Sequence, residues 1–283
     1  MQSTAAVNFT SELTTITPEL ARQWLANAAP NRPLNDDRIL MFAEEIERGH
    51  WRRNGETIKF DDCGRLIDGQ HRLHAVLLTG KTIEAIVVHG VSSTDGSMMT
   101  IDTGMKRTNS HVLSLIGEKN TAALAAALNW KYRYDNGKTG YHRGMLSAGE
   151  LQRTLVANPA IRDSVTCTGN YRTKLLPPGI SAWLHFEFSQ KDLPLANEFM
   201  QGMCDGFDPH IYQNFFRLRE RLTRERLSKH SVSPHEKAAY CVKSWNSTRN
   251  GTLIQQLKFL CARRVIMDQK TVEIPGETFP TIL

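Results

Sequence analysis

The chain has 283 residues, of which 40% are hydrophobic, and a formal net charge of +6. This length suits one large folded domain or two small ones. No apolar run approaches the roughly 20 residues of a membrane span, and the first residues lack the pattern of a secretion signal, so we expect a cytoplasmic protein. Five scattered cysteines without a C-x-x-C pair argue against a disulfide framework and against a structural zinc site.

The first hundred residues predict a compact α/β unit that follows a flexible tail, residues 1–14. Residues typical of helix ends, together with the periodicity of apolar residues, mark the elements of this unit. The pattern predicts helices at 17–28, 36–49 and 70–79, and strands at 57–60, 65–67 and 83–89.

The most informative stretch is the turn from strand to helix at Asp68-Gly69. The first N–H groups of a helix, with the positive end of its dipole, form a ready site for an anion. Gly69 permits close backbone approach, and Arg72 and His71 supply donors that suit phosphate oxygens. The alternative is an ordinary tight turn, with Asp68 as the N-cap and with His71 and Arg72 in solvent.

A family resemblance starts from the same residues. Gly69-Gln70-His71-Arg72, between an apolar strand and a helix that contains Ala75, resembles the phosphate-binding signature of the ParB/sulfiredoxin superfamily. The sequence Asp68-Gly69-Gln70-His71-Arg72 is similar to the form of this motif in phage and DNA-modification-associated members. The resemblance covers roughly residues 15 to 112 and implies that Gly69, His71 and Arg72 hold the phosphates of a nucleotide.

Gln70 departs from the family pattern. Sulfiredoxins carry their catalytic cysteine at this position, and partition proteins carry a glutamate, so neither chemistry transfers to this chain. Gln70 and the neighbouring Asp68 are therefore candidate catalytic residues without an assigned reaction. The family also builds part of its nucleotide pocket from the segment after the first helix. This makes Arg32 a candidate phosphate ligand, with a solvent-facing turn as the alternative.

A second turn of this kind follows at Asp102-Thr103-Gly104, after a short predicted strand. Asp102 is the candidate catalytic or magnesium-binding carboxylate. Lys106 and Arg107 precede a helix cap at Thr108 or Ser110 and can neutralise phosphate charge. The alternative is a capped turn with solvated cations.

The residues beyond Val112 are mainly helical. Their patterns predict helices at 121–134, 148–157, 181–189, 195–203, 212–229 and 233–248. The expected fold class is therefore α+β, with a small ParB/sulfiredoxin-like domain at 15–112 followed by a helical C-terminal domain at 113–283.

The positive charge is concentrated in the C-terminal part. Between Tyr212 and Lys270 thirteen Lys or Arg residues stand against four acidic residues. Such a surplus is an electrostatic footprint for a polyanion. Arg217, Arg221 and Arg224 of the basic helix are the candidate DNA contacts, and a solvated, salt-bridged helix is the alternative.

Together these features predict a nucleotide-binding protein that takes ATP or CTP with Mg²⁺. Hydrolysis or phosphoryl transfer would then be coupled to a DNA-related role. The alternative is a DNA-binding or nuclease-type protein, in which the Asp68–Arg72 turn and the basic lobe contact DNA phosphates without nucleotide turnover. A third alternative is an interaction scaffold that binds neither ligand. The sequence leaves open whether the chain forms a homodimer.

Overall fold

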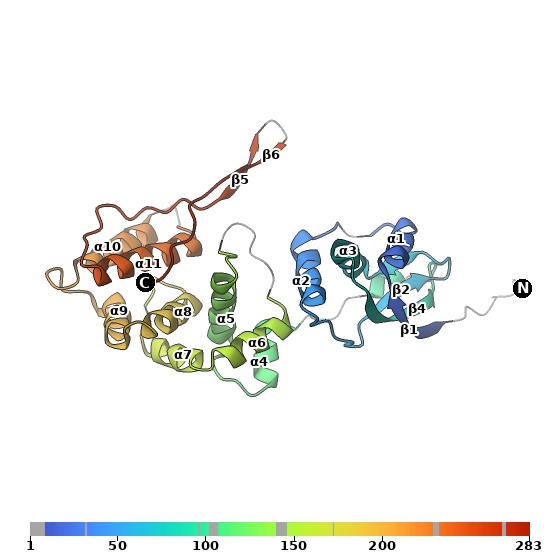
Figure 1. Cartoon of the computed structure of the whole chain (residues 1–283), viewed down its shortest axis with the longest axis horizontal. Helices are drawn as coiled ribbons and strands as arrows, with labels where there is room; N and C mark the ends of the chain where they lie inside the picture. The colour runs from blue at the N-terminus through green and yellow to red at the C-terminus, as the bar shows by residue number, and fades with distance from the viewer. Residues whose placement is uncertain are drawn as a thin grey trace, which may run out of the picture. The chain divides into compact units, whose positions relative to one another are not determined.

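The computed structural model describes residues 9–31, 33–95, 97–101, 107–139, 146–171, 173–228, 232–267 and 270–283. The chain divides into two compact units, residues 1–106 and residues 107–283 (Figure 1). The predicted boundary after Val112 falls inside helix α4, Asn109–Leu115, which belongs to the second unit. A small mixed sheet combined with many helices confirms the α+β class.

A four-stranded sheet with the order β1-β4-β2-β3 forms the centre of the N-terminal unit. Strand β4 runs parallel to β2 and antiparallel to β1, and β2 pairs antiparallel with β3. The elements of this unit are β1 (Thr10–Ile16), α1 (Pro18–Ala26), α2 (Asp36–Glu47), β2 (Thr57–Asp61), β3 (Leu66–Asp68), α3 (Gln70–Thr79), β4 (Ile83–Val91) and the 3₁₀ helix η1 (Ser97–Thr100).

The core of the N-terminal unit lies between the sheet and its helices. Ile83, Ala85 and Val87 of β4 are buried, while Glu84 between them is exposed, as the two-residue period of a strand requires. Helical residues that pack into the same core are Ala21 of α1, Ala43 and Ile46 of α2, and Leu73, Ala75 and Val76 of α3.

Two segments of this unit correct the sequence predictions. Residues 10–14, expected in a flexible tail, form most of β1 and pair with β4 at the edge of the sheet. Their polar side chains hide the strand pattern because an edge strand is largely exposed to solvent. The strand expected just before Asp102 is wrong as well, because residues 97–100 form the 3₁₀ helix η1.

The C-terminal unit is mainly helical, as predicted. Its elements are α4, α5 (Thr121–Asp135), α6 (Ala148–Ala157), α7 (Ile161–Asn170), α8 (Pro178–Ser189), α9 (Leu193–Asp205), α10 (Gln213–Leu227), α11 (Pro234–Arg249), β5 (Arg263–Met267) and β6 (Lys270–Ile274). Helix α7 and the β5–β6 hairpin are absent from the sequence prediction. Among the described residues, no helix combines the length and the hydropathy that crossing a membrane requires.

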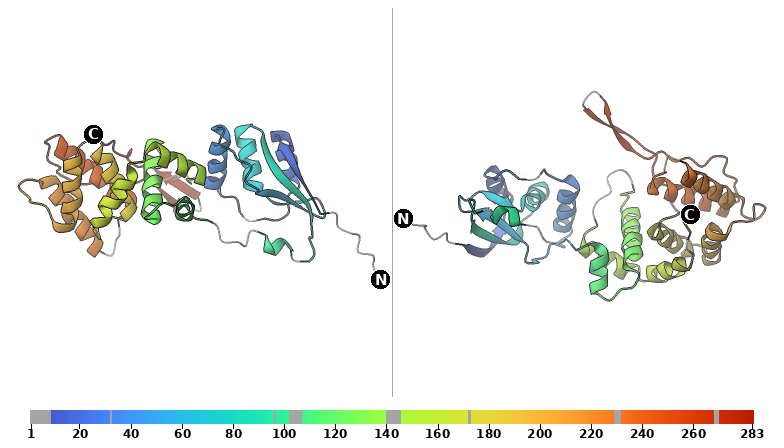
Figure 2. Two further views of the ribbon diagram at one scale, coloured as in Figure 1. Left: turned by 90° about the horizontal axis from the view of Figure 1, so that it is seen from below. Right: turned by 180° about the vertical axis from the view of Figure 1, so that it is seen from behind.

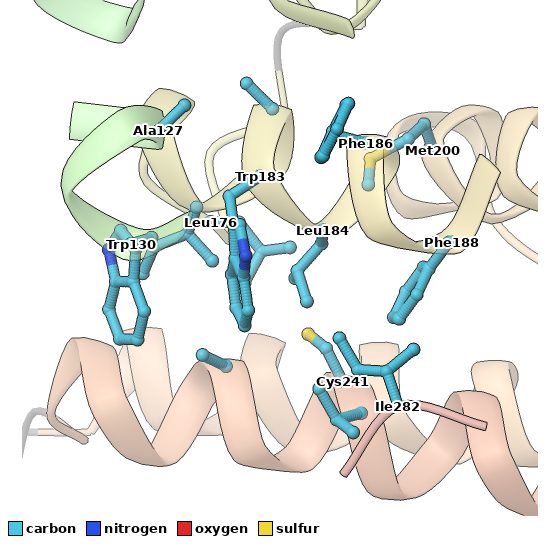
Figure 3. Close-up of a cluster of buried hydrophobic side chains, with 14 of the residues drawn as sticks. Ala127, Trp130, Leu176, Trp183, Leu184, Phe186, Phe188, Met200, Cys241 and Ile282 are labelled. Carbon is cyan, nitrogen blue, oxygen red and sulfur yellow. The ribbon is translucent and has the colours of Figure 1, made fainter. Parts of the chain in front are cut away.

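Helix α8 is the central helix of this unit. All its residues from Gly179 to Phe186 are buried, so the helix is enclosed around its whole circumference, with Ser181 and His185 as its buried polar residues in this stretch. Trp183 stacks on Trp130 of α5 with ring centroids 5.2 Å apart. Figure 3 shows Trp183, Leu184 and Phe188 pointing from α8 toward α11. At Gly179 an added Cβ would lie 2.3 Å from the Cβ of Ala126, so the glycine permits the close approach of α5 and α8.

The last residues pack back onto the helices of the C-terminal unit. Ile282 is buried, and its backbone N–H donates to the Tyr134 hydroxyl at 2.8 Å. Trp245 of α11 donates its indole N–H to the carbonyl of Leu283 at 3.2 Å. Before this segment, the β5–β6 hairpin extends away from the helices of the unit (Figures 1 and 2).

Candidate functional site

The predicted turn from strand to helix lies at the end of β3. This strand ends at Asp68, Gly69 is the N-cap, and α3 begins at Gln70. The carbonyl of Gly69 accepts from the backbone N–H groups of Arg72 and Leu73 at 3.0 and 3.1 Å. Gly80 ends the helix in the left-handed conformation, so both ends of α3 agree with the sequence prediction.

The position of Gly69 imposes two constraints that no other residue type satisfies. Its φ of +107° lies in the region that L side chains rarely adopt. An added Cβ would also lie 2.9 Å from Cγ1 of Ile58 in β2. The backbone at the start of α3 therefore passes directly over the core side chain of Ile58, and only glycine fits there.

Helices α2 and α3 lie side by side (Figure 1). The contacts at their two ends show that they run in the same direction. At one end, the backbone N–H of Asn35, the N-cap of α2, donates to Nε2 of His71 at 3.1 Å. At the other end, the ammonium group of Lys81 donates to the carbonyl of Glu47 at 2.9 Å. The two helix N-termini therefore meet beside Gly69, and the positive ends of their dipoles add at this place.

The charges around this point leave a positive surplus next to α3. Asp36 and Asp37 compensate the first turn of α2, whereas the first turn of α3 has no acidic residue. Lys59 of β2 contacts Oδ2 of Asp68 at 2.7 Å, and Nη2 of Arg72 lies 3.7 Å from the same oxygen. Two cations thus share one carboxylate.

The predicted phosphate ligands on α3 make contacts inside the unit. Nε2 of His71 accepts a hydrogen bond from Asn35, so this nitrogen is not available as a donor to a phosphate. Nη2 of Arg72 donates to the carbonyl of Thr57 at 2.6 Å and so attaches α3 to β2. Both side chains are almost fully buried, whereas Gln70 is half-buried at the start of the helix.

The loop that contains Arg32 runs along the end of β3. Asn31 donates from Nδ2 to the carbonyl of Ile67 at 3.0 Å, and Asn35 contacts His71 as described above. Asn31 and Asn35 therefore both lie at the junction, the place where β3 ends and α2 and α3 begin. Arg32 itself lies outside the described residues. Asp102 and Lys106 also lie outside them, and Arg107 is exposed at the start of the C-terminal unit.

Sequence reasoning missed Lys59. This lysine alternates with Ile58 and Phe60 in β2 and is the cross-strand partner of Asp68 in β3. The turn at 61–64 between two short strands could have predicted this pair, because a short turn determines which residues of the two strands face each other. At 26% exposure, the side chain of Lys59 is the most accessible of the Lys59, Asp68 and Arg72 cluster.

Among the described residues, the His, Cys, Asp and Glu side chains that lie close enough in a group of three to share a metal ion are Asp61, Asp62 and Cys63. The buried carboxylate of Asp61 already accepts from two backbone N–H groups and from Nε of Arg65 at 2.8 Å. Hydrogen bonds from Ser93 lower the pKa of Asp62. These contacts stabilise the turn between β2 and β3, so we assign the group a structural role.

The candidate DNA contacts on α10 divide into two kinds. Arg217 donates to the carbonyl of Ile254 at 2.6 Å, and Arg221 pairs with Glu225 at 2.6 Å. Arg224 is exposed, as is Arg226 two residues further on. Within the predicted set, Arg224 is therefore the residue that a polyanion reaches most directly.

Comparisons with known proteins add no family: no family model, curated protein or solved structure matches the chain.

We expect Gly69→Ala to destabilise the N-terminal unit by about 2 kcal/mol or more, because left-handed strain adds to overlap with Ile58. Hydrogen exchange of the β2 and β3 amides measures the effect. Gly80→Ala is the control, since Gly80 also has a positive φ, of +65°, but no atom lies within 4 Å of an added Cβ. Equal losses in the two variants would contradict the role assigned to the Ile58 contact.

Proposed function

We propose that the N-terminal unit is a ParB/sulfiredoxin-like domain that binds the phosphates of a nucleoside triphosphate where α2 and α3 begin. The observation that carries this proposal is the meeting of two parallel helix N-termini beside Lys59 and Arg72. Helix N-termini attract anions, and cationic side chains strengthen this attraction. The Asp68–Arg72 motif favours a nucleotide as the source of the phosphate.

Each part of the junction has a proposed role. Gly69 brings the backbone close to the ligand, and Lys59 contacts the ligand from β2. Arg72, buried in the first turn of α3, supplies positive charge. Asn31 and Asn35, on either side of Arg32 in the sequence, lie at the same place, and Arg32 is a further proposed phosphate ligand. The nucleotide would be ATP or CTP with Mg²⁺, for which Asp102 is the proposed ligand and Lys106 and Arg107 the proposed cations. Hydrolysis or phosphoryl transfer in a DNA-related process remains the proposed activity.

Asp68 offers a test whose expected result is a gain of affinity. Its carboxylate shares Lys59 and Arg72, so it competes with an incoming phosphate. Asp68→Asn should tighten binding of ATP or CTP about fivefold, corresponding to about 1 kcal/mol of relieved repulsion in a partly screened site. Isothermal titration of the full chain, with and without Mg²⁺, measures the affinities.

The matched control is Glu47→Gln. It removes the same charge from the same unit, but at the far end of α2, where Glu47 pairs with Lys81 at 2.9 Å. The proposal expects unchanged affinity in this variant. Absence of nucleotide binding to the unaltered chain contradicts the proposal. Weaker binding to Asp68→Asn only when Mg²⁺ is present would contradict this competition and favour the catalytic role that the sequence predicts for Asp68.

Arg72→Ala is a poor probe of the site, because Arg72 holds the carbonyl of Thr57 and its loss would loosen α3 from β2. A lower affinity would not distinguish a lost phosphate contact from a disturbed fold. Asp68→Asn avoids this ambiguity, since damage to the fold does not tighten binding.

The DNA-related part of the proposal rests on the exposed end of α10. Replacing Arg224 and Arg226 by Ala should weaken DNA binding and reduce the slope of log affinity against log salt by about 1 for each lost phosphate contact. Fluorescence anisotropy at several salt concentrations measures this slope. Lys119→Ala with Lys191→Ala removes the same charge from exposed sites outside α10 and serves as the control. An equal loss in both double variants would indicate a non-specific charge effect.

A further inference from the structure

Three helices of the C-terminal unit bring a thiol, an imidazole and an amide together. Sγ of Cys167 in α7 lies 3.5 Å from Nε2 of His185 in α8 and 3.7 Å from Oδ1 of Asn197 in α9. Nε2 of His185 lies 3.0 Å from Oδ1 of Asn197. The three atoms form a nearly equilateral triangle, and each comes from a different helix.

The size of this triangle matches one face of a tetrahedral metal site. With metal distances of about 2.3 Å to sulfur and 2.0–2.2 Å to nitrogen and oxygen, neighbouring ligand atoms lie roughly 3.3–3.6 Å apart. The three observed separations bracket this range. An ion could therefore bind all three atoms after shifts of a few tenths of an ångström.

The second nitrogen of His185 has a partner that can orient the ring for metal binding. Nδ1 lies 2.9 Å from Oγ of Ser164, which is almost fully buried. In the tautomer with the proton on Nδ1, this contact is a hydrogen bond to Ser164, and Nε2 presents its lone pair to the other two groups. Cys167 and Asn197 are only half-buried, so an ion can reach them from solvent.

We propose that Cys167, His185 and Asn197 form a binding site for a divalent transition metal ion, for which Zn²⁺ is the best match. Thiolate and imidazole are the ligands that zinc prefers, and water completes the tetrahedron. On binding, the Cys167 thiol releases its proton to solvent and its sulfur coordinates the ion. The imidazole proton of His185 moves through solvent from Nε2 to Nδ1, where Oγ of Ser164 accepts it, and Nε2 coordinates the ion. Without metal, Oδ1 of Asn197 accepts from the thiol and from Nε2–H of His185. The site lies within the C-terminal unit and does not depend on the proposed nucleotide site.

Titration of the reduced full chain with Co²⁺ alone tests this site, because cobalt reports thiolate coordination and tetrahedral geometry in its absorption spectrum. One equivalent should produce a thiolate-to-cobalt charge-transfer band together with intense visible bands, and Zn²⁺ should displace them. Cys167→Ser should abolish the charge-transfer band. Cys204→Ser, which alters a half-buried cysteine of α9 outside this group of three residues, should leave it unchanged.

Asn197→Asp provides a variant with an expected gain. It replaces a neutral ligand oxygen by a charged one of similar size, so Co²⁺ affinity should rise roughly tenfold. Misfolding does not produce such a gain. The proposal is overturned if the unaltered chain shows no charge-transfer band, if the band persists in Cys167→Ser, or if Asn197→Asp binds Co²⁺ no more tightly than the unaltered chain.

Discussion

The hydrogen bond from the Asn35 backbone to His71 determines how the N-terminal unit presents its candidate site. It joins the first turns of α2 and α3, and the contact of Lys81 with Glu47 joins their last turns. Parallel helix dipoles repel each other when they lie side by side, so this arrangement needs compensating charge. Asp36 and Asp37 provide it at the start of α2, and Lys81 provides it at the opposite end. The start of α3 has no such acid, and this is where an anion gains most.

The ion cluster beside this point suggests how the site is kept in order without a ligand. Lys59 and Arg72 share the carboxylate of Asp68, which neutralises these two cations as a bound phosphate would. Because Arg72 also holds the carbonyl of Thr57, its guanidinium is fixed before any ligand arrives. A phosphate would therefore meet preorganised charge and would pay little entropy for ordering side chains. Asp68 would in turn limit the affinity for a phosphate, because it competes for the same cations.

Much of this organisation could be predicted from the sequence. The bounds of α3 follow from two glycines and from apolar periodicity, and the α+β class follows from the order of strands and helices. The roles of His71 and Arg72 could not be predicted, because their partners Asn35 and Thr57 are distant in the sequence and are set by the packing of α2 and β2. Strand β1 escaped detection because its side chains are polar at the sheet edge. Cys167, His185 and Asn197 have no motif spacing, since three separate helices bring them together.

The central claim is that an anionic nucleotide binds where α2 and α3 begin. Titration of the isotope-labelled full chain with ATP or CTP and Mg²⁺, followed by amide chemical shifts in NMR spectra, tests it most directly. We expect saturable shifts at Gln70, His71 and Asp36, with the amides of α10 unchanged. Shifts confined to the arginine-rich helix α10, or none at all, would contradict it.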